Sequence, residues 1–166
     1  MYIDKTKMIF VIIFVGLLCG IAGYTSTSCY DGWLAFDGSC YYFGTNAIHF
    51  TEAEHFCKQH DGGHLIHVDR KLENDFIKDR LRAFKSHSWW MGLTDELIEG
   101  TWKWLDNGQT ANFTDWHPVE PSGGEAEDCA VFYTAFDFTW ADLTCISNNY
   151  PICELPGVST ETEIIG

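Results

Sequence analysis

Residues 89–105, WWMGLTDELIEGTWKWL, join two tryptophan-rich segments through a short acidic stretch. Segments 89–93 and 101–105 are short, rich in aromatic residues and close to glycines, a sequence pattern that is typical of β-strands. Three further segments of the same kind follow, at 130–133, 138–140 and 150–153. The second half of the chain therefore predicts a set of short strands.

Helical patterns come before these strands. Thr51 can cap a helix, with Glu54 three residues later. The apolar side chains that share one face of this helix are Ala53, Phe56 and Cys57. A second helix is predicted from about 70 to 84, where apolar residues recur at helical spacing: Leu72, Phe76, Ile77 and Leu81.

Residues 29–43 predict a β-hairpin at the start of the domain, because aromatic side chains lie on both sides of the turn dipeptide Asp37-Gly38. Helices first and strands after indicate an α+β fold. Between two predicted strands lies a long stretch, 106–128, without a regular pattern. Its Trp116 and two prolines favour an ordered, functional loop.

The first residues have the pattern of a secretory signal peptide, 1–22. Lysines precede an apolar run, 8–18, and small residues lead up to Ala22, after which we expect cleavage. A membrane anchor needs about 20 consecutive apolar residues, so we expect no membrane insertion. The mature protein is then predicted to be secreted and extracellular, with one domain, 23–154, and a flexible acidic tail, 155–166.

Composition narrows the function classes. The formal net charge is −14, with 24 acidic against 10 basic residues, which argues against a nucleic-acid partner. Aromatic residues make up 16% of the chain and charged residues 20%, which suits a packed core rather than disorder. So many acids raise the question of whether some carboxylates are spaced as cation ligands.

The cysteine count agrees with secretion. Cleavage would remove Cys19 from a set of seven and leave six, an even number, which suits an oxidising compartment. Six cysteines can pair in about 15 ways, so arithmetic alone leaves the pairing open. The six are Cys29, Cys40, Cys57, Cys129, Cys145 and Cys153.

An ordered series of motifs resembles a long-form, secreted, single-domain C-type lectin, or C-type-lectin-like domain. It consists of the cysteines, WMGL at 90–93, TWKW at 101–104, Glu120-Pro121, Glu127-Asp128-Cys129, Trp140-Ala141-Asp142 and Pro151-Ile152-Cys153-Glu154. The resemblance implies two helices with small antiparallel sheets and a long loop region. It also implies three disulfides: Cys29–Cys40, Cys57–Cys153 and Cys129–Cys145.

The resemblance further implies a calcium ion that also binds carbohydrate. Its ligands would be Glu120, Ser122, Glu127 and Asp142, and the Glu120-Pro121 pair is similar to mannose-type rather than galactose-type members. Ser122 stands where such members have a longer amide side chain, and its hydroxyl reaches less far. Ala141 stands where they have an asparagine, and offers no ligand.

A second calcium site is implied at Asp95, Glu99 and Asp128, close to Glu127. Another family aspartate would fall near Gly123 and is missing. The alternative interpretation is that these residues are solvated surface acids that bind no ion.

Other patterns are weaker. The histidines at 55, 60, 64 and 67 could be zinc ligands, but surface or half-buried positions explain them as well. No nucleophile stands beside a base, so we do not expect an enzyme. Asn112-Phe113-Thr114 is an N-glycosylation sequon, which predicts a glycan on Asn112.

The sequence thus predicts a secreted, calcium-dependent carbohydrate-binding protein, mannose-type more than galactose-type. Microbial or self glycans would be its partners, in innate defence or adhesion. The sequence leaves the oligomeric state undecided, and it contains no coiled-coil neck that would predict an oligomer. The alternative is a calcium-independent domain of the same fold that binds protein, lipid or mineral surfaces.

Overall fold

The computed structural model describes residues 25–84 and 87–161. The predicted signal peptide, 1–22, and the last residues of the predicted tail, 162–166, lie outside this range. The helices are α2 (Phe50–Gln59), α3 (Lys71–Phe84) and the 3-10 helices η1 (Gly124–Ala126) and η2 (Thr134–Phe136). The strands are β1 (Thr25–Ser28), β2 (Leu34–Phe36), β3 (Ser39–Phe43), β4 (His64–Leu65), β5 (Trp89–Thr94), β6 (Lys103–Trp104), β7 (Cys129–Phe132), β8 (Trp140–Leu143), β9 (Tyr150–Pro156) and β10 (Val158–Glu161).

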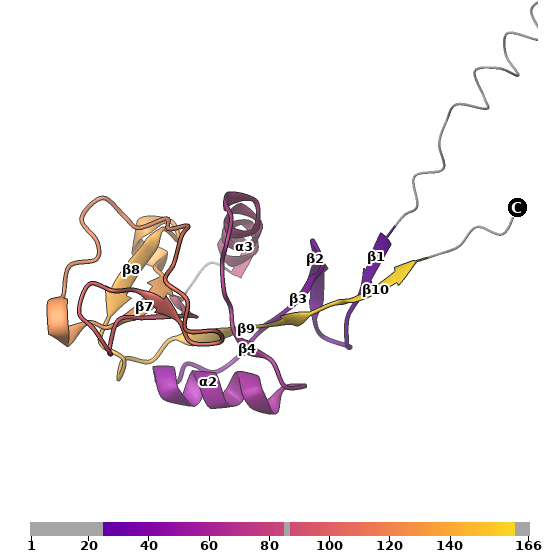
Figure 1. Ribbon diagram of the computed structural model, residues 1–166, viewed down its shortest axis with the longest axis horizontal. Helices are drawn as coiled ribbons and strands as arrows, with labels where there is room; N and C mark the ends of the chain where they lie inside the picture. The colour runs from indigo at the N-terminus through magenta and orange to yellow at the C-terminus, as the bar shows by residue number, and fades with distance from the viewer. Residues whose placement is uncertain (1–24, 85–86, 162–166) are drawn as a thin grey trace, which may run out of the picture. The chain divides into compact units, whose positions relative to one another are not determined.

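An eight-stranded sheet runs in the order β2-β3-β9-β5-β7-β8, with β4 on β9 and β6 on β5 (Figure 1). All pairs are antiparallel except β5 and β9, where Trp89 lies opposite Tyr150. Strands β1 and β10 pair in a separate two-stranded sheet. Thr27–Val158 form one compact unit, which holds every residue of the candidate site.

The predicted hairpin is confirmed as β2 and β3. Phe36 pairs with Ser39, so the turn consists of Asp37 and Gly38 alone. Their φ angles are 47° and 91°, the left-handed conformation that a two-residue hairpin turn of type I′ requires at both positions. The predicted disulfides are present as well: Cys29–Cys40, Cys57–Cys153 and Cys129–Cys145.

The N-cap of helix α2 lies two residues before the predicted cap. His49 is the N-cap, and its backbone N–H donates to the Glu52 carboxylate at 3.2 Å. Thr51 is an exposed residue of the first turn, so its predicted role as the cap was wrong. The earlier start lets Phe50 join Ala53 and Cys57 on the buried face.

Helix α3 buries most of the predicted apolar face, with Phe76 partly buried against the core, but it does not bury Leu72. Ile77 and Leu81 are fully buried, whereas Leu72 is 59% exposed. Polar side chains fill the rest of the contact face. Asn74 accepts a hydrogen bond from Trp140 Nε1 at 2.9 Å, and Lys78 pairs with Asp115 at 2.6 Å. Thus α3 is attached to the sheet and to the long loop partly through polar contacts.

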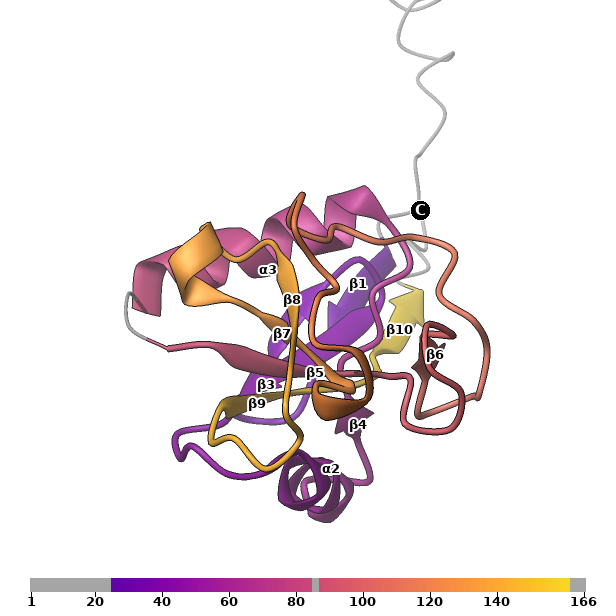
Figure 2. The same ribbon diagram turned by 90° about the vertical axis from the view of Figure 1, so that its left-hand side faces the viewer.

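The core lies on both sides of the sheet, because α2 and α3 occupy opposite sides of β9 (Figure 2). All six residues of β5 are buried, and its side chains alternate between the two sides. Trp90 packs towards α2 with Leu65 and Cys57, while Met91 and Leu93 pack with Ile77 of α3.

Three predicted boundaries differ from the structure. The strand predicted at 101–105 shortens to Lys103–Trp104, and the one predicted at 138–140 becomes Trp140–Leu143. Phe138 has a φ of 64°, which ends the preceding turn instead of starting a strand. The domain also continues past Glu154, because β9 pairs with β3 as far as Pro156 opposite Ser39. The predicted flexible tail therefore does not begin at Leu155.

Glu73 of α3 is buried and Glu154 of β9 is partly buried, and neither carboxyl group has a cationic partner within hydrogen-bonding distance among the described residues. Glu73 accepts a hydrogen bond from the Tyr41 hydroxyl at 2.6 Å, and Glu154 accepts one from the Ser39 hydroxyl at 2.8 Å. Burial raises the pKa of Glu73 and of Glu154 above the ordinary value of 4.5. The unfolded chain therefore ionises these groups at lower pH than the folded protein does.

Stability should consequently fall as the pH rises from about 4.5 through the raised pKa values, since the folded state binds more protons in that window. Glu73→Gln cannot ionise, so its melting temperature should improve relative to wild type between pH 4 and pH 7. Differential scanning fluorimetry of both proteins in chelator measures this difference. A difference that is constant with pH would contradict the raised pKa of Glu73.

Candidate functional site

The acids predicted as ligands come from three neighbouring segments. Glu120 and Ser122 lie in the long loop, Glu127 lies two residues before β7, and Asp142 lies in β8. Strands β7 and β8 are antiparallel, with Ala130 opposite Asp142. This pairing brings the residues before β7 to the end of β8 at which Asp142 lies.

Asp142 anchors the loop to the sheet. Its side chain is buried, and both carboxylate oxygens accept the Ser122 N–H, at 2.8 and 2.9 Å. One of them also accepts the Gly123 N–H at 2.9 Å. The Glu120-Pro121 peptide bond between these groups and the rest of the loop is cis.

Gly123 is required by close packing at this point. A Cβ atom at position 123 would overlap the Glu127 side chain. The glycine thus lets the loop pass directly against Glu127. The family resemblance indicates only that an aspartate is missing at Gly123. The close approach of Gly123 to Glu127 depends on the fold and leaves no pattern in the sequence.

No lysine or arginine of the described residues forms an ion pair with the carboxylates of this site. Burial, followed by a hydrogen bond and charge interaction with Asp142, raises the pKa of Glu120. Burial and the charge of Asp142 also raise the pKa of Glu127. Glu120 Oε2 is buried and has no hydrogen-bond partner among the described residues. A positive charge beside these carboxylates would offset the repulsion between them.

The second predicted set is also brought together. Asp95 is buried, its N–H donates to the Asp128 carbonyl at 3.2 Å, and its Oδ2 accepts the Gly100 N–H at 2.8 Å. Asp95 Oδ1 is buried without a partner in the described part of the chain. Burial and the charge of Asp128 raise the pKa of Asp95. Partial desolvation and the charges of Asp95 and Asp128 raise the pKa of Glu99, which is exposed.

Within residues 25–84 and 87–161, one closely spaced group of potential metal ligands cannot serve as a metal site. Glu96, Cys129 and Cys145 offer atoms within 4.8 Å of one another, but the two cysteines form a disulfide. The oxygens of Glu120, Glu127 and Asp142 do not all lie this close.

Other predicted residues are separate from this site. Asn112 is exposed, while the neighbouring Phe113 packs edge-on against Trp140 with ring centroids 5.7 Å apart. Trp116 contacts Trp102 and Trp140, which confirms an ordered loop. His67 bonds to Asp69 and Asp106 through its two ring nitrogens, and His60 and His64 bond to backbone carbonyls. None of the helices in the described ranges is long and apolar enough to cross a membrane.

Comparison with known proteins agrees with this architecture. The family model described as the lectin C-type domain matches residues 46–155. Human C-type lectin domain family 17, member A is 36% identical over 141 residues, which cover 82% of this chain and 35% of that relative. The chain therefore spans about a third of that protein's length.

Solved structures are similar over most of the chain. The cow carbohydrate-recognition domain of CD23, crystallised in the presence of GlcNAc2Man3 oligosaccharide, is 29% identical with a TM-score of 0.72. The matched region covers 80% of this chain and 99% of that one. A calcium-independent type II antifreeze protein is 27% identical with a TM-score of 0.71, covering 80% and 98%. On its fold, its three disulfides and these matches, the chain belongs to the C-type lectin domain family.

Proposed function

We propose that this domain binds calcium through Glu120, Ser122, Glu127 and Asp142, and binds carbohydrate at the same place. The observation that carries the proposal is Glu120 Oε2, which is buried without a hydrogen-bond partner among the described residues and lies beside two further carboxylates. Calcium takes six to eight oxygen ligands, so backbone carbonyls and water would complete the set. The donor chemistry of these residues suits a hard cation.

The bound ion would coordinate two adjacent hydroxyl groups of a sugar. Glu120 and Glu127 would accept the protons of those hydroxyls in hydrogen bonds, and Asp142 would hold the loop in place through Ser122 and Gly123. The Ser122 hydroxyl reaches less far than the amide of sugar-binding members, and Ala141 offers no ligand atom, so the two amides are not fully replaced. Calcium affinity is therefore expected at the weak end for extracellular modules, about 10⁻⁴ to 10⁻³ M.

A second calcium at Asp95, Glu99 and Asp128 would brace the loop against β5. Support comes from Asp95 Oδ1, which is buried without a partner among the described residues. The ion would relieve the repulsion that raises the pKa of Glu99.

The preferred partner is a mannose-type glycan of microbial or self origin. Support comes from Glu120-Pro121 and from the likeness to a structure solved with GlcNAc2Man3. A single weak site gains useful strength by multivalency, so oligomers or clustered glycans would matter. Secretion, a glycan on Asn112, a role in defence or adhesion, and the absence of catalysis belong to the same proposal.

A second candidate is calcium-independent binding of a protein, lipid or mineral surface. Two observations favour it: Ala141 is only 1% exposed and offers no ligand atom, and a calcium-independent antifreeze protein is similar in structure. Both candidates use the same fold.

Glycan-array binding with calcium and then with chelator separates them. We expect weak, chelator-sensitive signals on mannose-containing glycans, which Glu120→Gln abolishes. Glu125→Gln is the matched control, because it removes the same charge from an exposed residue of the adjacent η1. Binding that persists in chelator, or no glycan signal at all, would favour the calcium-independent candidate.

A further inference from the structure

Lys103 has no ion-pair partner among the described residues of this strongly acidic protein. Five other lysines and arginines of the described ranges form ion pairs: Lys58, Arg70, Lys71, Lys78 and Arg82. Arg80 lies over the Phe76 ring. Within residues 25–84 and 87–161, Lys103 alone among the lysines and arginines has no such partner. Although the protein has 24 acidic residues, no described carboxylate forms an ion pair with the Lys103 ammonium.

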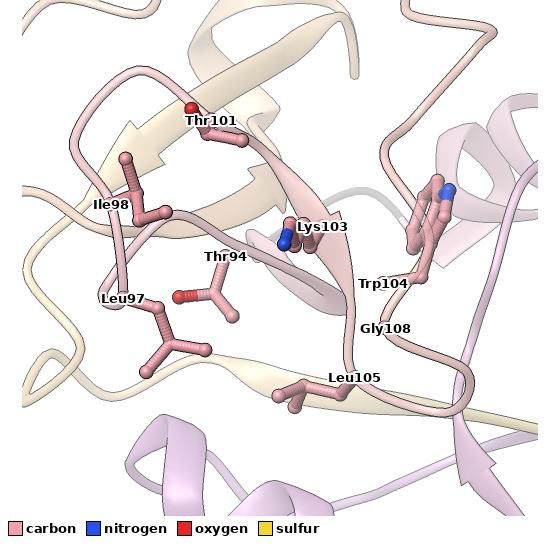
Figure 3. Close-up of a pocket in the computed structure, with 8 residues that line it drawn as sticks. All are labelled: Thr94, Leu97, Ile98, Thr101, Lys103, Trp104, Leu105 and Gly108. Carbon is pink, nitrogen blue, oxygen red and sulfur yellow. The ribbon is translucent and has the colours of Figure 1, made fainter.

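The side chain of Lys103 lines a mostly apolar cavity of about 140 Å³. Leu97, Ile98 and Leu105 contribute its aliphatic walls, although they are 88%, 58% and 38% exposed. Figure 3 shows the Lys103 nitrogen among these side chains, close to Thr94. The acids Asp95 and Glu99 are not among the residues that line the cavity.

The strand pairing explains this arrangement. Lys103 of β6 lies opposite Thr94 of β5, and the next residue, Trp104, points to the other side and is buried in the core. The connecting turn is held by Ile98 N–H to Asp95 O and Thr101 N–H to Ile98 O, both 2.9 Å. Leu97 and Ile98 are therefore presented outwards by an ordered backbone.

We propose that this cavity binds a small amphipathic anion, a carboxylate with an apolar group of about six carbon atoms. An apolar cavity of about 150 Å³ can hold benzene, which sets the size of the apolar group. The carboxylate pairs with the Lys103 ammonium. A protein of net charge −14 repels anions in general, so a bound anion needs such a local cation.

The test is titration of the full chain with hexanoate, hexan-1-ol and hexylammonium, followed by backbone amide NMR in chelator. We expect hexanoate to shift residues 94–108 saturably, with an affinity that rises about fourfold per methylene from butanoate to hexanoate. Hexan-1-ol should bind about fivefold more weakly, and hexylammonium more weakly still. Chelator removes any contribution from the proposed calcium site, so the two proposals can fail separately.

Variants identify the groups. Lys103→Gln should lower hexanoate affinity about fivefold without changing that of hexan-1-ol. Leu97→Ser should weaken both, and because Leu97 is exposed the fold is retained. Lys58→Gln and Ile146→Ser are controls at exposed positions that do not line the cavity. The proposal is overturned if Lys103→Gln binds hexanoate like wild type, if hexylammonium binds as tightly, or if residues 94–108 show no saturable shift.

Discussion

A variant in which Cys57 and Cys153 are both alanine should lose about 4 kcal/mol of unfolding free energy. This disulfide joins α2 to β9 across a sequence separation of 96. In the chain-entropy account a cross-link over about 100 residues stabilises by roughly 4.7 kcal/mol, since it restricts the unfolded chain. Urea unfolding followed by tryptophan fluorescence measures the loss.

The shorter cross-link supplies the control. Cys129 and Cys145 are separated by 16 residues, so the corresponding double alanine variant should lose only about 3 kcal/mol. The order of the two losses is the informative result. A larger loss for the shorter loop would show that local packing, rather than loop length, dominates the stabilisation.

The Trp140→Ala variant should lose about 4 kcal/mol, the cost of emptying a large core site. Trp140 is fully buried and packs edge-on against Trp104, Phe113 and Trp116. Its Nε1 also donates to Asn74 Oδ1, which the truncation leaves buried and unpaired. Chemical unfolding measures the stability.

Trp140→Phe separates packing from hydrogen bonding, because it keeps an aromatic ring and loses the donor. It should lose about 2 kcal/mol. Trp33→Phe is the matched control, since the Trp33 indole donates to Asp61 at an exposed position. It should cost well under 1 kcal/mol. If Trp140→Ala cost no more than Trp33→Phe, the conclusion that Trp140 is a core residue packed against the long loop would be wrong.

Much of the fold was predictable where local chemistry and tertiary packing agree. Asp37-Gly38 defines the hairpin turn by its own backbone preference, and the tryptophans of β5 fit a strand that is buried on both sides. The disulfide pairing came from the family resemblance, because arithmetic left about 15 alternatives. The parallel pairing of β5 with β9 was not predicted, since contacts between distant segments leave no local pattern.

The errors occurred where tertiary contacts outweigh local propensity. Thr51 is a better cap by residue type, but packing of Phe50 moves the helix start to His49. The periodicity of α3 included Leu72, whereas the fold buries Asn74 and Lys78 through partners in β8 and the long loop. Those partners lie 37 or more positions away in sequence, beyond the reach of a local pattern.

For the candidate site, the residue types were predictable and their surroundings were not. The four residues around Glu120-Pro121 and the set at Asp95 and Asp128 do lie near one another in space. The hydrogen bonds from Ser122 and Gly123 to Asp142, and the burial of Glu120 Oε2, depend on how the loop folds against β8.

Calorimetric titration with calcium at pH 7 tests the central claim most directly. The wild-type protein should bind with a dissociation constant of about 10⁻⁴ to 10⁻³ M. Glu120→Gln should weaken binding by about tenfold or more, and Glu125→Gln should match wild type. The absence of binding heat in the wild-type protein up to about 10 mM calcium, well above that range, would contradict the claim. So would equal binding by Glu120→Gln and wild type.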